Sequence, residues 1–385
     1  MEVLGQNSGS NHEEMSESDK YLIIELVNLR LPVKMLMRSK CVSPHLCRLI
    51  NSQDFRRLYL HHNNTNSDNF HLFVSIRQPL GQKMINTLGS VDVSHNQALR
   101  DVYSKRFSRD YEIVGCCNGL ICLYRDVEFR LVLWNAFTRE YKILPEPRDC
   151  KIRGGHEHFS HGFGHDGVTN DYKVVKIFQS FKDGKMLVTD VNVYSLKSNL
   201  WTKVGDFPFG VSDFPKNGCF LNGALHWLAS MNESTAKPMN ESTAKPLVVR
   251  FKLGVEKFDL LQVPDVDSDD DLRLGVLGDC LSVCASNEDS STAVIWVAKN
   301  REPWTWIKQH SVVFEASDKT NIRTLAYTDK GKKLLLTVGS KTLVWYGLRD
   351  EEDNKFSLPR HTIGFEAATC IESLESLGVD SRADV

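Results

Sequence analysis

A repeat of about 50 residues constrains the fold of this chain more than any other feature of its sequence. Five stretches each contain a short alternating apolar strand, a polar turn and a second strand that carries an aromatic residue. Their anchor residues are Trp134, Tyr194, Phe251, Val297 and Tyr346, which are 60, 57, 46 and 49 residues apart. A unit of this size cannot bury both of its faces alone, so the repeat predicts similar units packed side by side.

The 57-residue spacing between Tyr194 and Phe251 contains a perfect tandem duplication. MNESTAKP occurs twice in succession, from Met231 to Pro246. A loop can absorb such a polar insertion at small entropic cost, whereas a strand could not do so without a change of register. We therefore expect the duplication to lie in a loop at the edge of one unit.

Most units contain a second hairpin upstream of the anchor. Two-residue turns between apolar runs mark these hairpins: Asn118-Gly119, Asp183-Gly184, Asn222-Gly223, Gly278-Asp279 and Lys330-Gly331. Such pairs accept the positive φ angles that tight hairpins demand. Two hairpins make four strands, which is typical of a β-propeller blade. The stretches near Phe70 and between Thr362 and Leu377 can complete a sixth unit, so we expect a mainly β fold of about six four-stranded blades.

One motif suggests a different class of protein. Residues 162 to 167 read GFGHDG, which has the Gly-x-Gly-x-x-Gly spacing of a dinucleotide-binding turn. That turn works only when a helix opens at its last glycine. After Gly167 the chain continues VTNDYKVVKIF, whose β-branched and aromatic residues predict a strand. We therefore expect GFGHDG to form the first strand and turn of a blade, where glycine permits close backbone approach.

Composition excludes further classes. The chain has 385 residues, of which 41% are hydrophobic and 25% charged, and its net charge is -2. Without a basic excess, a dedicated nucleic-acid surface is not expected. The sequence contains no apolar run long enough for membrane insertion, and its polar, acidic N-terminus lacks the apolar core of a signal peptide. We expect a protein of the cytoplasm, the nucleus or both.

Metal and cofactor sites find little support. The ten cysteines contain no Cys-x-x-Cys pair and are expected to be reduced thiols packed in strands. HEHFSHGFGH places His156, His158, His161 and His165 close together, but zinc ligands usually come from separated pieces of chain. The acidic run DVDSDDD lacks the glycine and glutamate of a calcium loop. We expect no cofactor, and a copper-type oxidase or sugar-binding propeller would depend on the histidine cluster.

The first 65 residues follow a helical pattern. Three short helices are expected. The first begins at Pro32 and carries Val33, Leu36, Met37 and Cys41 on one face; the second opens at Pro44 with Leu46, Leu49 and Ile50 inward; the third is capped by Ser52, with Phe55, Leu58 and Tyr59 as its apolar residues. The preceding YLIIELVNL suits a helix or a buried strand. Helices this short need a partner, which favours a protein-binding role.

These residues resemble a known family. LRLPVKMLMRSKCVS followed by LINSQDFRRLYL resembles the F-box of plant F-box proteins. The segments CNGLICL, LVLWNAFTREYKILP, GFGHDGVTNDYKVVKI, VYSLKSNLW, FLNGALHWLA, VLGDCLSV and IWVAK resemble successive signatures of their F-box-associated, kelch-like interaction domain. The resemblance runs from about Tyr21 to Leu377 in the family's order. It is closest to the F-box/kelch-repeat group that includes immune-regulating and S-locus F-box proteins.

The resemblance implies a substrate receptor of a Skp–cullin–F-box ubiquitin ligase, a subunit without catalytic residues of its own. The F-box would bind a Skp-type adaptor and through it the cullin, while the β domain would bind an unknown protein for ubiquitination and proteasomal degradation. The adaptor-facing residues would be Leu31, Pro32, Val33, Leu36, Cys41 and Val42. The implied domains are a disordered segment 1–19, a degenerate F-box 20–65, a kelch-like propeller 66–378 and a disordered tail 379–385.

The sequence also departs from the family pattern. The usual Leu-Pro is missing before Tyr21, YLIIELVNLRLPVK is one residue too long, Leu46 replaces a Trp, and Pro44 interrupts a basic stretch. An extra residue turns a helical face by about 100 degrees, which would weaken adaptor docking. An adaptor-independent scaffold therefore remains an alternative. Substrate contacts are guessed only from loop position, at Arg148, Arg153, His158, Phe209, Phe214 and Asp269.

Overall fold

The protein is described by a computed structural model. It describes residues 27–64, 70–80, 83–91, 99–100, 111–125, 128–147, 156–182, 185–207, 210–211, 217–231, 245–267, 270–287, 292–299, 304–314, 321–339, 341–349 and 352–378. The predicted tail segments 1–19 and 379–385, the sequence before Val27 and the predicted boundary at residue 65 all lie outside these ranges, so the domain limits stay predictions.

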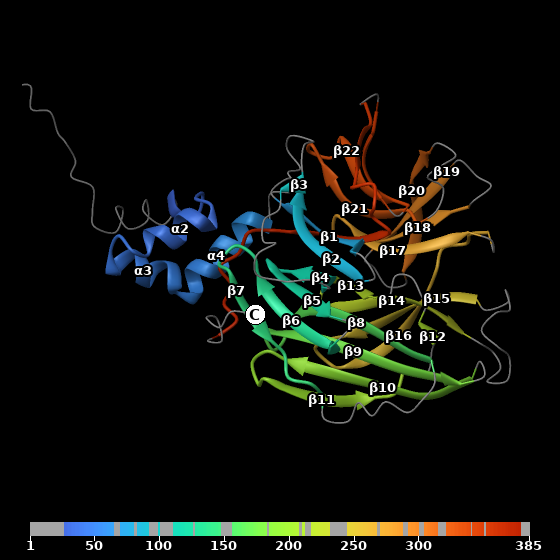
Figure 1. Cartoon of the computed structure of the whole chain (residues 1–385), viewed down its shortest axis with the longest axis horizontal. Coiled ribbons are helices and arrows are strands. Elements are labelled where there is room, and N and C mark those ends of the chain that lie inside the picture. The colour runs from blue at the N-terminus through green and yellow to red at the C-terminus, as the bar shows by residue number, and fades with distance from the viewer. Residues whose placement is uncertain are drawn as a thin grey trace, which may run out of the picture.

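Three helices lie in residues 27–64, which we call the helical module (Figure 1). They are α2 (Val33–Ser39), α3 (Pro44–Asn51) and α4 (Gln53–Asn64). The Ser43 hydroxyl accepts the N–H of Leu46 at 3.2 Å, and the Ser52 hydroxyl accepts the N–H of Phe55 at 3.2 Å. These serine caps and Pro44 at the start of α3 confirm the predicted helix starts.

The described strands form six units of four (Figure 1). Blade 1 contains β1 (His71–Leu80), β2 (Lys83–Val91), β3 (Leu99–Arg100) and β25 (Gly364–Cys370); blade 2, β4 (Tyr111–Cys117), β5 (Leu120–Arg125), β6 (Arg130–Asn135) and β7 (Glu140–Ile143); blade 3, β8 (His156–Asp166), β9 (Asp171–Lys182), β10 (Lys185–Ser195) and β11 (Leu200–Gly205). Blade 4 contains β13 (Asn217–Leu221), β14 (Ala224–Met231), β15 (Lys245–Lys252) and β16 (Lys257–Gln262), with β12 (Gly210–Val211) on β14; blade 5, β17 (Asp271–Leu277), β18 (Cys280–Ser286), β19 (Thr292–Lys299) and β20 (Thr305–Val313); blade 6, β21 (Arg323–Thr328), β22 (Lys333–Val338), β23 (Thr342–Gly347) and β24 (Asn354–Ser357).

Two pairings join blades to one another. The last strand, β25, pairs with β1 from His71↔Cys370 to Arg77↔Gly364, so the C-terminal strand completes blade 1 and closes the ring. Strands β8 and β13 pair in parallel at His161 and Gly162, which links blades 3 and 4 into one sheet. The expected sixth unit is therefore built from both ends of the repeat region, and the β-propeller prediction is confirmed.

The repeat pattern also holds in detail. All five anchor residues lie in the third strand of their blades, β6, β10, β15, β19 and β23. Asn118 and Gly119 have φ angles of 50° and 79°, and Asn222 and Gly223 have 48° and 75°, as the hairpin prediction requires. The Asp183-Gly184 turn lies outside the described residues. The octapeptide duplication begins at Met231, the last residue of β14, and ends with Lys245 and Pro246 at the start of β15, so most of it lies in the connection between these two strands.

Apolar side chains gather in six clusters, one between each pair of neighbouring blades. In β9, for example, Val174 packs toward blade 2 while Val175 packs toward blade 4. Successive side chains of a strand point to opposite faces, so each blade contributes to two clusters. The remaining interfaces are filled in the same way. A seventh cluster lies between the three helices of the module and includes Leu374, from the segment after β25.

Candidate functional site

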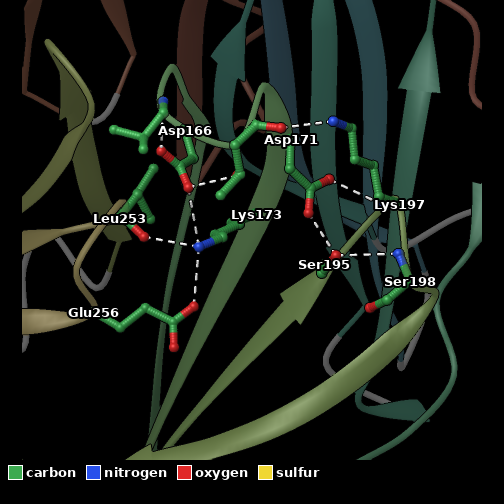
Figure 2. A network of polar contacts seen from close by, with 10 residues as sticks. Asp166, Asp171, Lys173, Ser195, Lys197, Ser198, Leu253 and Glu256 are labelled. Carbon is green, nitrogen blue, oxygen red and sulfur yellow. Dashed lines mark hydrogen bonds and ion pairs between the residues drawn. The ribbon is translucent and has the colours of Figure 1, made fainter.

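The GFGHDG segment forms the end of β8 and the turn into β9 (Figure 2). The Asp166 carboxylate accepts the N–H of Val168 at 2.9 Å and the hydroxyl of Thr169 at 2.6 Å. The buried Lys173 ammonium lies 3.2 Å from Asp166 and donates to the Glu256 carboxylate at 2.9 Å and the Leu253 carbonyl at 2.8 Å. This network fixes the turn and joins it to the β15–β16 turn of blade 4, which is a structural role.

The glycines of the motif permit close packing, as expected. A Cβ atom at Gly162 would lie 2.8 Å from Leu225 and Trp227, and one at Gly164 would overlap the Phe220 ring. A Cβ atom at Gly167 would meet nothing within 4 Å. The first two glycines therefore make room for side chains of blade 4, and the strand predicted after the motif is β9.

The histidine cluster does not converge on one point. His158 and His161 are three residues apart in β8, so their side chains lie on opposite faces of the strand. The ring centroids of His158 and Phe181 are 5.3 Å apart, and those of the buried His161 and Tyr124 are 4.1 Å apart. Nε2 of His165 lies 3.1 Å from the amide oxygen of Asn170. The side chain of His156 lies outside the described residues. Among the residues that are described, no three His, Cys, Asp or Glu side chains could hold a metal ion.

The six predicted adaptor-facing residues fall into two groups. Val33 and Leu36 are fully buried in the module's cluster, which also contains Ile50, Phe55, Tyr59 and Leu374. In this conformation these two residues face the core of the module, and their role in adaptor binding stays a prediction. Leu31 is half-buried, and Pro32, Cys41 and Val42 are exposed. Helix α2 ends at Ser39, before Cys41, so Cys41 is not on its inner face.

Three further apolar residues of the module are exposed. Val27 is 56% exposed, Met35 46% and Leu58 46%. Of the three apolar residues expected in the third helix, Phe55 and Tyr59 are buried, whereas Leu58 is exposed. Met35 follows the buried Val33 by two positions, which puts it on the opposite side of α2. The sequence patterns did not indicate that these three residues are exposed, because helical spacing was used only to identify inward-facing residues.

The helical module is attached to the propeller by residues 371–378, which follow β25 and run between α4 and blade 2 (Figure 1). Leu374 packs in the module's cluster, whereas Leu377 packs in the cluster between blades 2 and 3. The Asn135 amide donates to the carbonyls of Ser373 at 3.2 Å and Glu375 at 2.8 Å. The module therefore lies on the propeller face at which β25 and the other innermost strands end.

A cavity of about 150 Å³ lies at the centre of the ring. All six innermost strands line it: β25, β4, β8, β13, β17 and β21. Its polar residues include Asn217, Thr324 and Arg323, and the Arg323 guanidinium donates to the Ala367 carbonyl at 2.6 Å. This cavity is the hollow that remains where six blades meet.

The guessed substrate loops cannot be compared with the structure, except at one residue. His158 is exposed on β8, and the other five lie outside the described residues.

The nine cysteines that the structure describes are free thiols. Of the described helices, none combines the length and apolar character needed to cross a membrane.

Comparison with known proteins gives a consistent picture. Residues 70–373 match the F-box associated beta propeller domain family. The chain is 27% identical over 380 residues to F-box protein CPR1 of Arabidopsis thaliana, covering 91% of this chain and 87% of that protein. It is 28% identical over 306 residues to an F-box/kelch-repeat protein of the same plant, covering 75% and 78%.

The family match spans all six blades and the ring-closing strand β25, and the similarity to CPR1 is long enough to extend over most of the chain. The helical module precedes the ring, as the F-box resemblance implied, and its short helices begin where the sequence pattern predicted them. The chain belongs to the plant F-box proteins that carry an F-box-associated β-propeller domain.

Proposed function

We propose that this protein is the substrate-recognition subunit of a Skp–cullin–F-box ubiquitin ligase. The helical module would bind a Skp-type adaptor, and the propeller would bind the protein to be ubiquitinated. The observation that carries the proposal is a module with an apolar outer surface fixed to a ring that has its own closed core. The chemistry of ubiquitin transfer would belong to the partner enzymes.

The apolar outer surface supports adaptor binding. Four of the exposed large apolar side chains in the described chain, Val27, Met35, Val42 and Leu58, belong to the small helical module. The other seven are spread over the much larger propeller. Exposed apolar side chains concentrated on a small module are typical of a protein interface, whose affinity rests on a few buried anchors.

The opposite face of the propeller is the proposed substrate surface. The β4–β5 turn contacts the attached segment, since a Cβ at Gly119 would overlap Ser373. The first turn of each blade therefore lies on the side of the module. Because strands alternate in direction, the connections from second to third strand and from blade to blade lie on the other side. Substrate bound there would not compete with the adaptor for space, and loops are where propellers carry recognition.

Calorimetric titration of the purified protein with a plant Skp-type adaptor tests the proposal. We expect micromolar or tighter binding by the wild type. Val42 is 76% exposed, and Val42→Asp should weaken binding about tenfold or more because it introduces a charge into an apolar interface.

The matched control is Val168→Asp, the same substitution at an 85% exposed residue of the β8–β9 turn. It should bind like the wild type. Leu36→Ala should lose the module's helices by circular dichroism, because Leu36 is a core residue. Absence of binding by the wild type would contradict the proposal and favour the adaptor-independent scaffold, whose basis is the set of departures around Tyr21 and Leu46.

A further inference from the structure

We propose that Glu372 is a positioning residue that fixes the angle between the helical module and the propeller. Its carboxylate receives donors from three separate parts of the chain, and we call this arrangement the Glu372 junction. The consequence for ubiquitin transfer rests on the function proposed above, but the junction itself does not.

The three donors come from both sides of the boundary. The backbone N–H of Val33, at the start of α2, donates to Oε2 of Glu372 at 2.8 Å. The hydroxyl of Tyr59, in α4, lies 3.1 Å from the same oxygen and 2.9 Å from the Leu31 carbonyl, so its single proton is shared between these two acceptors. Nε2 of His71, at the start of β1, lies 3.4 Å from Oε1. One side chain therefore holds two helices of the module and the first propeller strand.

The junction is sheltered enough for these contacts to matter. The Glu372 side chain is 18% exposed and that of His71 is 44% exposed. Burial alone would raise the pKa of Glu372, but the contacts with His71, Val33 and Tyr59 lower it below its ordinary value. Glu372 is therefore ionised at neutral pH. Hydrogen bonds to a charged, partly buried acceptor are stronger than those between neutral groups.

The backbone around Glu372 is held as firmly as its side chain. The Asn63 amide, near the end of α4, donates to the Glu372 carbonyl at 3.3 Å. On the other side, Asn135 of blade 2 binds the carbonyls of Ser373 and Glu375. Glu372 therefore lies on a segment anchored in blade 2, so its side chain transmits the position of the propeller to α2.

A fixed angle has a functional consequence for a ligase receptor. Ubiquitin transfer requires a substrate lysine to reach the partner enzyme, and a rigid connection restricts which lysines can do so. A module that swivels on the propeller would still bind the adaptor, because its exposed surface is unchanged. It would present the bound protein over a wider range of orientations.

Spin labels measure the angle directly. We would label Val42→Cys and Val168→Cys in a chain whose exposed and partly exposed cysteines (Cys41, Cys47, Cys116, Cys219 and Cys280) and Cys150 are serine, and record distance distributions by pulsed electron paramagnetic resonance. The wild-type junction should give one narrow distribution. Glu372→Gln, which keeps the size but removes the charge, should broaden it, and the Val33 amide should exchange about tenfold faster with deuterium.

Glu352→Gln is the matched control. It makes the same substitution at an exposed glutamate of blade 6, outside the junction, and should keep the narrow distribution. Tyr59→Phe removes one donor and leaves the ring in the core, so it should broaden the distribution less than Glu372→Gln. An unchanged narrow distribution and unchanged Val33 exchange in Glu372→Gln would overturn the proposal. If Glu372→Gln does not fold, the same result in Tyr59→Phe would overturn it.

A reconstituted ligase separates this proposal from the function on which its consequence rests. The adaptor-binding affinity of Glu372→Gln should stay within about twofold of the wild type, since the outer surface is intact. Self-ubiquitination mapped by mass spectrometry should spread from a restricted set of propeller lysines to a wider set. Loss of adaptor binding in the wild type would contradict the ligase function alone, whereas an unchanged lysine pattern with a broadened distance distribution would contradict the functional consequence of the junction.

Discussion

The helical module and the propeller bury their apolar side chains in different ways. The propeller has six clusters, and each of its blades contributes to two of them. The module has one cluster, and one of its buried residues, Leu374, comes from the far end of the chain. Each blade is therefore supported by its two neighbouring blades. The module depends in part on residues 371–378, which follow β25.

This difference predicts which parts of the protein should unfold together. A change within one blade interface affects two blades directly and the others through ring closure. A change in the module's cluster affects short helices, which are marginal without tertiary support. We therefore expect the module to open without the ring, but the ring not to open without the module, because β25 leads directly into residues 371–378.

The largest effect should come from breaking a blade interface. Trp227 is 1% exposed, and a Cβ at Gly162 or Gly218 would collide with it, so its ring fills the space between blades 3 and 4. Trp227→Ala should lower the free energy of unfolding by about 3–5 kcal/mol. Thermal denaturation followed by near-ultraviolet circular dichroism measures this loss.

Leu260→Ala provides the comparison within blade 4. Leu260 is 47% exposed in β16, so its truncation should change the stability by less than about 0.5 kcal/mol. If Trp227→Ala speeds deuterium exchange only in blades 3 and 4 and leaves the other blades unaffected, the ring is less cooperative than its closure implies.

The two leucines of the attached segment allow a sharper contrast. Leu374 and Leu377 are three residues apart, and their exposed fractions are almost equal, at 3% and 2%. Leu374→Ala should destabilise the module by about 3 kcal/mol and speed deuterium exchange in α2 to α4 only. Leu377→Ala should act instead on blades 2 and 3. Identical exchange patterns in the two variants would mean that module and ring open together.

The sequence indicated the propeller well because its signal is local and repeated. Anchors such as Trp134 and turns such as Asn118-Gly119 recur at a regular spacing, so one weak unit is supported by the others. The helix caps Ser43 and Ser52 are equally local. These features need only nearby residues, and the structure confirms them.

The candidate site was harder to predict because it depends on distant residues. Val33 and Leu36 have the helical spacing of either a core face or a binding face, and part of the cluster that buries them, Leu374, comes from the far end of the chain. Val33 and Glu372 are 339 positions apart in the chain. No spacing rule distinguishes Glu372 from other glutamates, so the junction could not have been found from the sequence.

The glycine motif offers a test of medium size within the ring. A Cβ at Gly164 would overlap Phe220 of blade 4, whereas one at Gly167 would meet nothing. Gly164→Ala should cost about 2 kcal/mol of stability through overpacking, and Gly167→Ala should be close to neutral. Chemical denaturation of both variants checks this. Equal stability would mean that β8 and β13 can shift apart, and that the contact between blades 3 and 4 is looser than their parallel pairing indicates.

The smallest effect concerns acid, which should distinguish the ring from the module. His226 is 1% exposed in β14, and its burial lowers its pKa to about 4, while the Cys219 backbone and Asp259 raise it and Arg250 lowers it further. Because the unfolded chain binds a proton at higher pH than the folded ring does, stability should fall as pH drops below about 6.5. Between pH 7 and pH 5.5 the expected loss is about 1 kcal/mol.

His226→Phe should flatten this dependence, since the ring then has no group to protonate at that position. The Glu372 junction responds to acid only at lower pH. Because the pKa of Glu372 is lowered, the carboxylate stays ionised, and its contribution to stability is lost only as pH falls below the ordinary glutamate range. At pH 5.5 deuterium exchange should therefore increase in blade 4 before it increases at Val33. Faster exchange at Val33 first would mean that the contact between the module and the propeller is weaker in acid than the interface between blades 3 and 4.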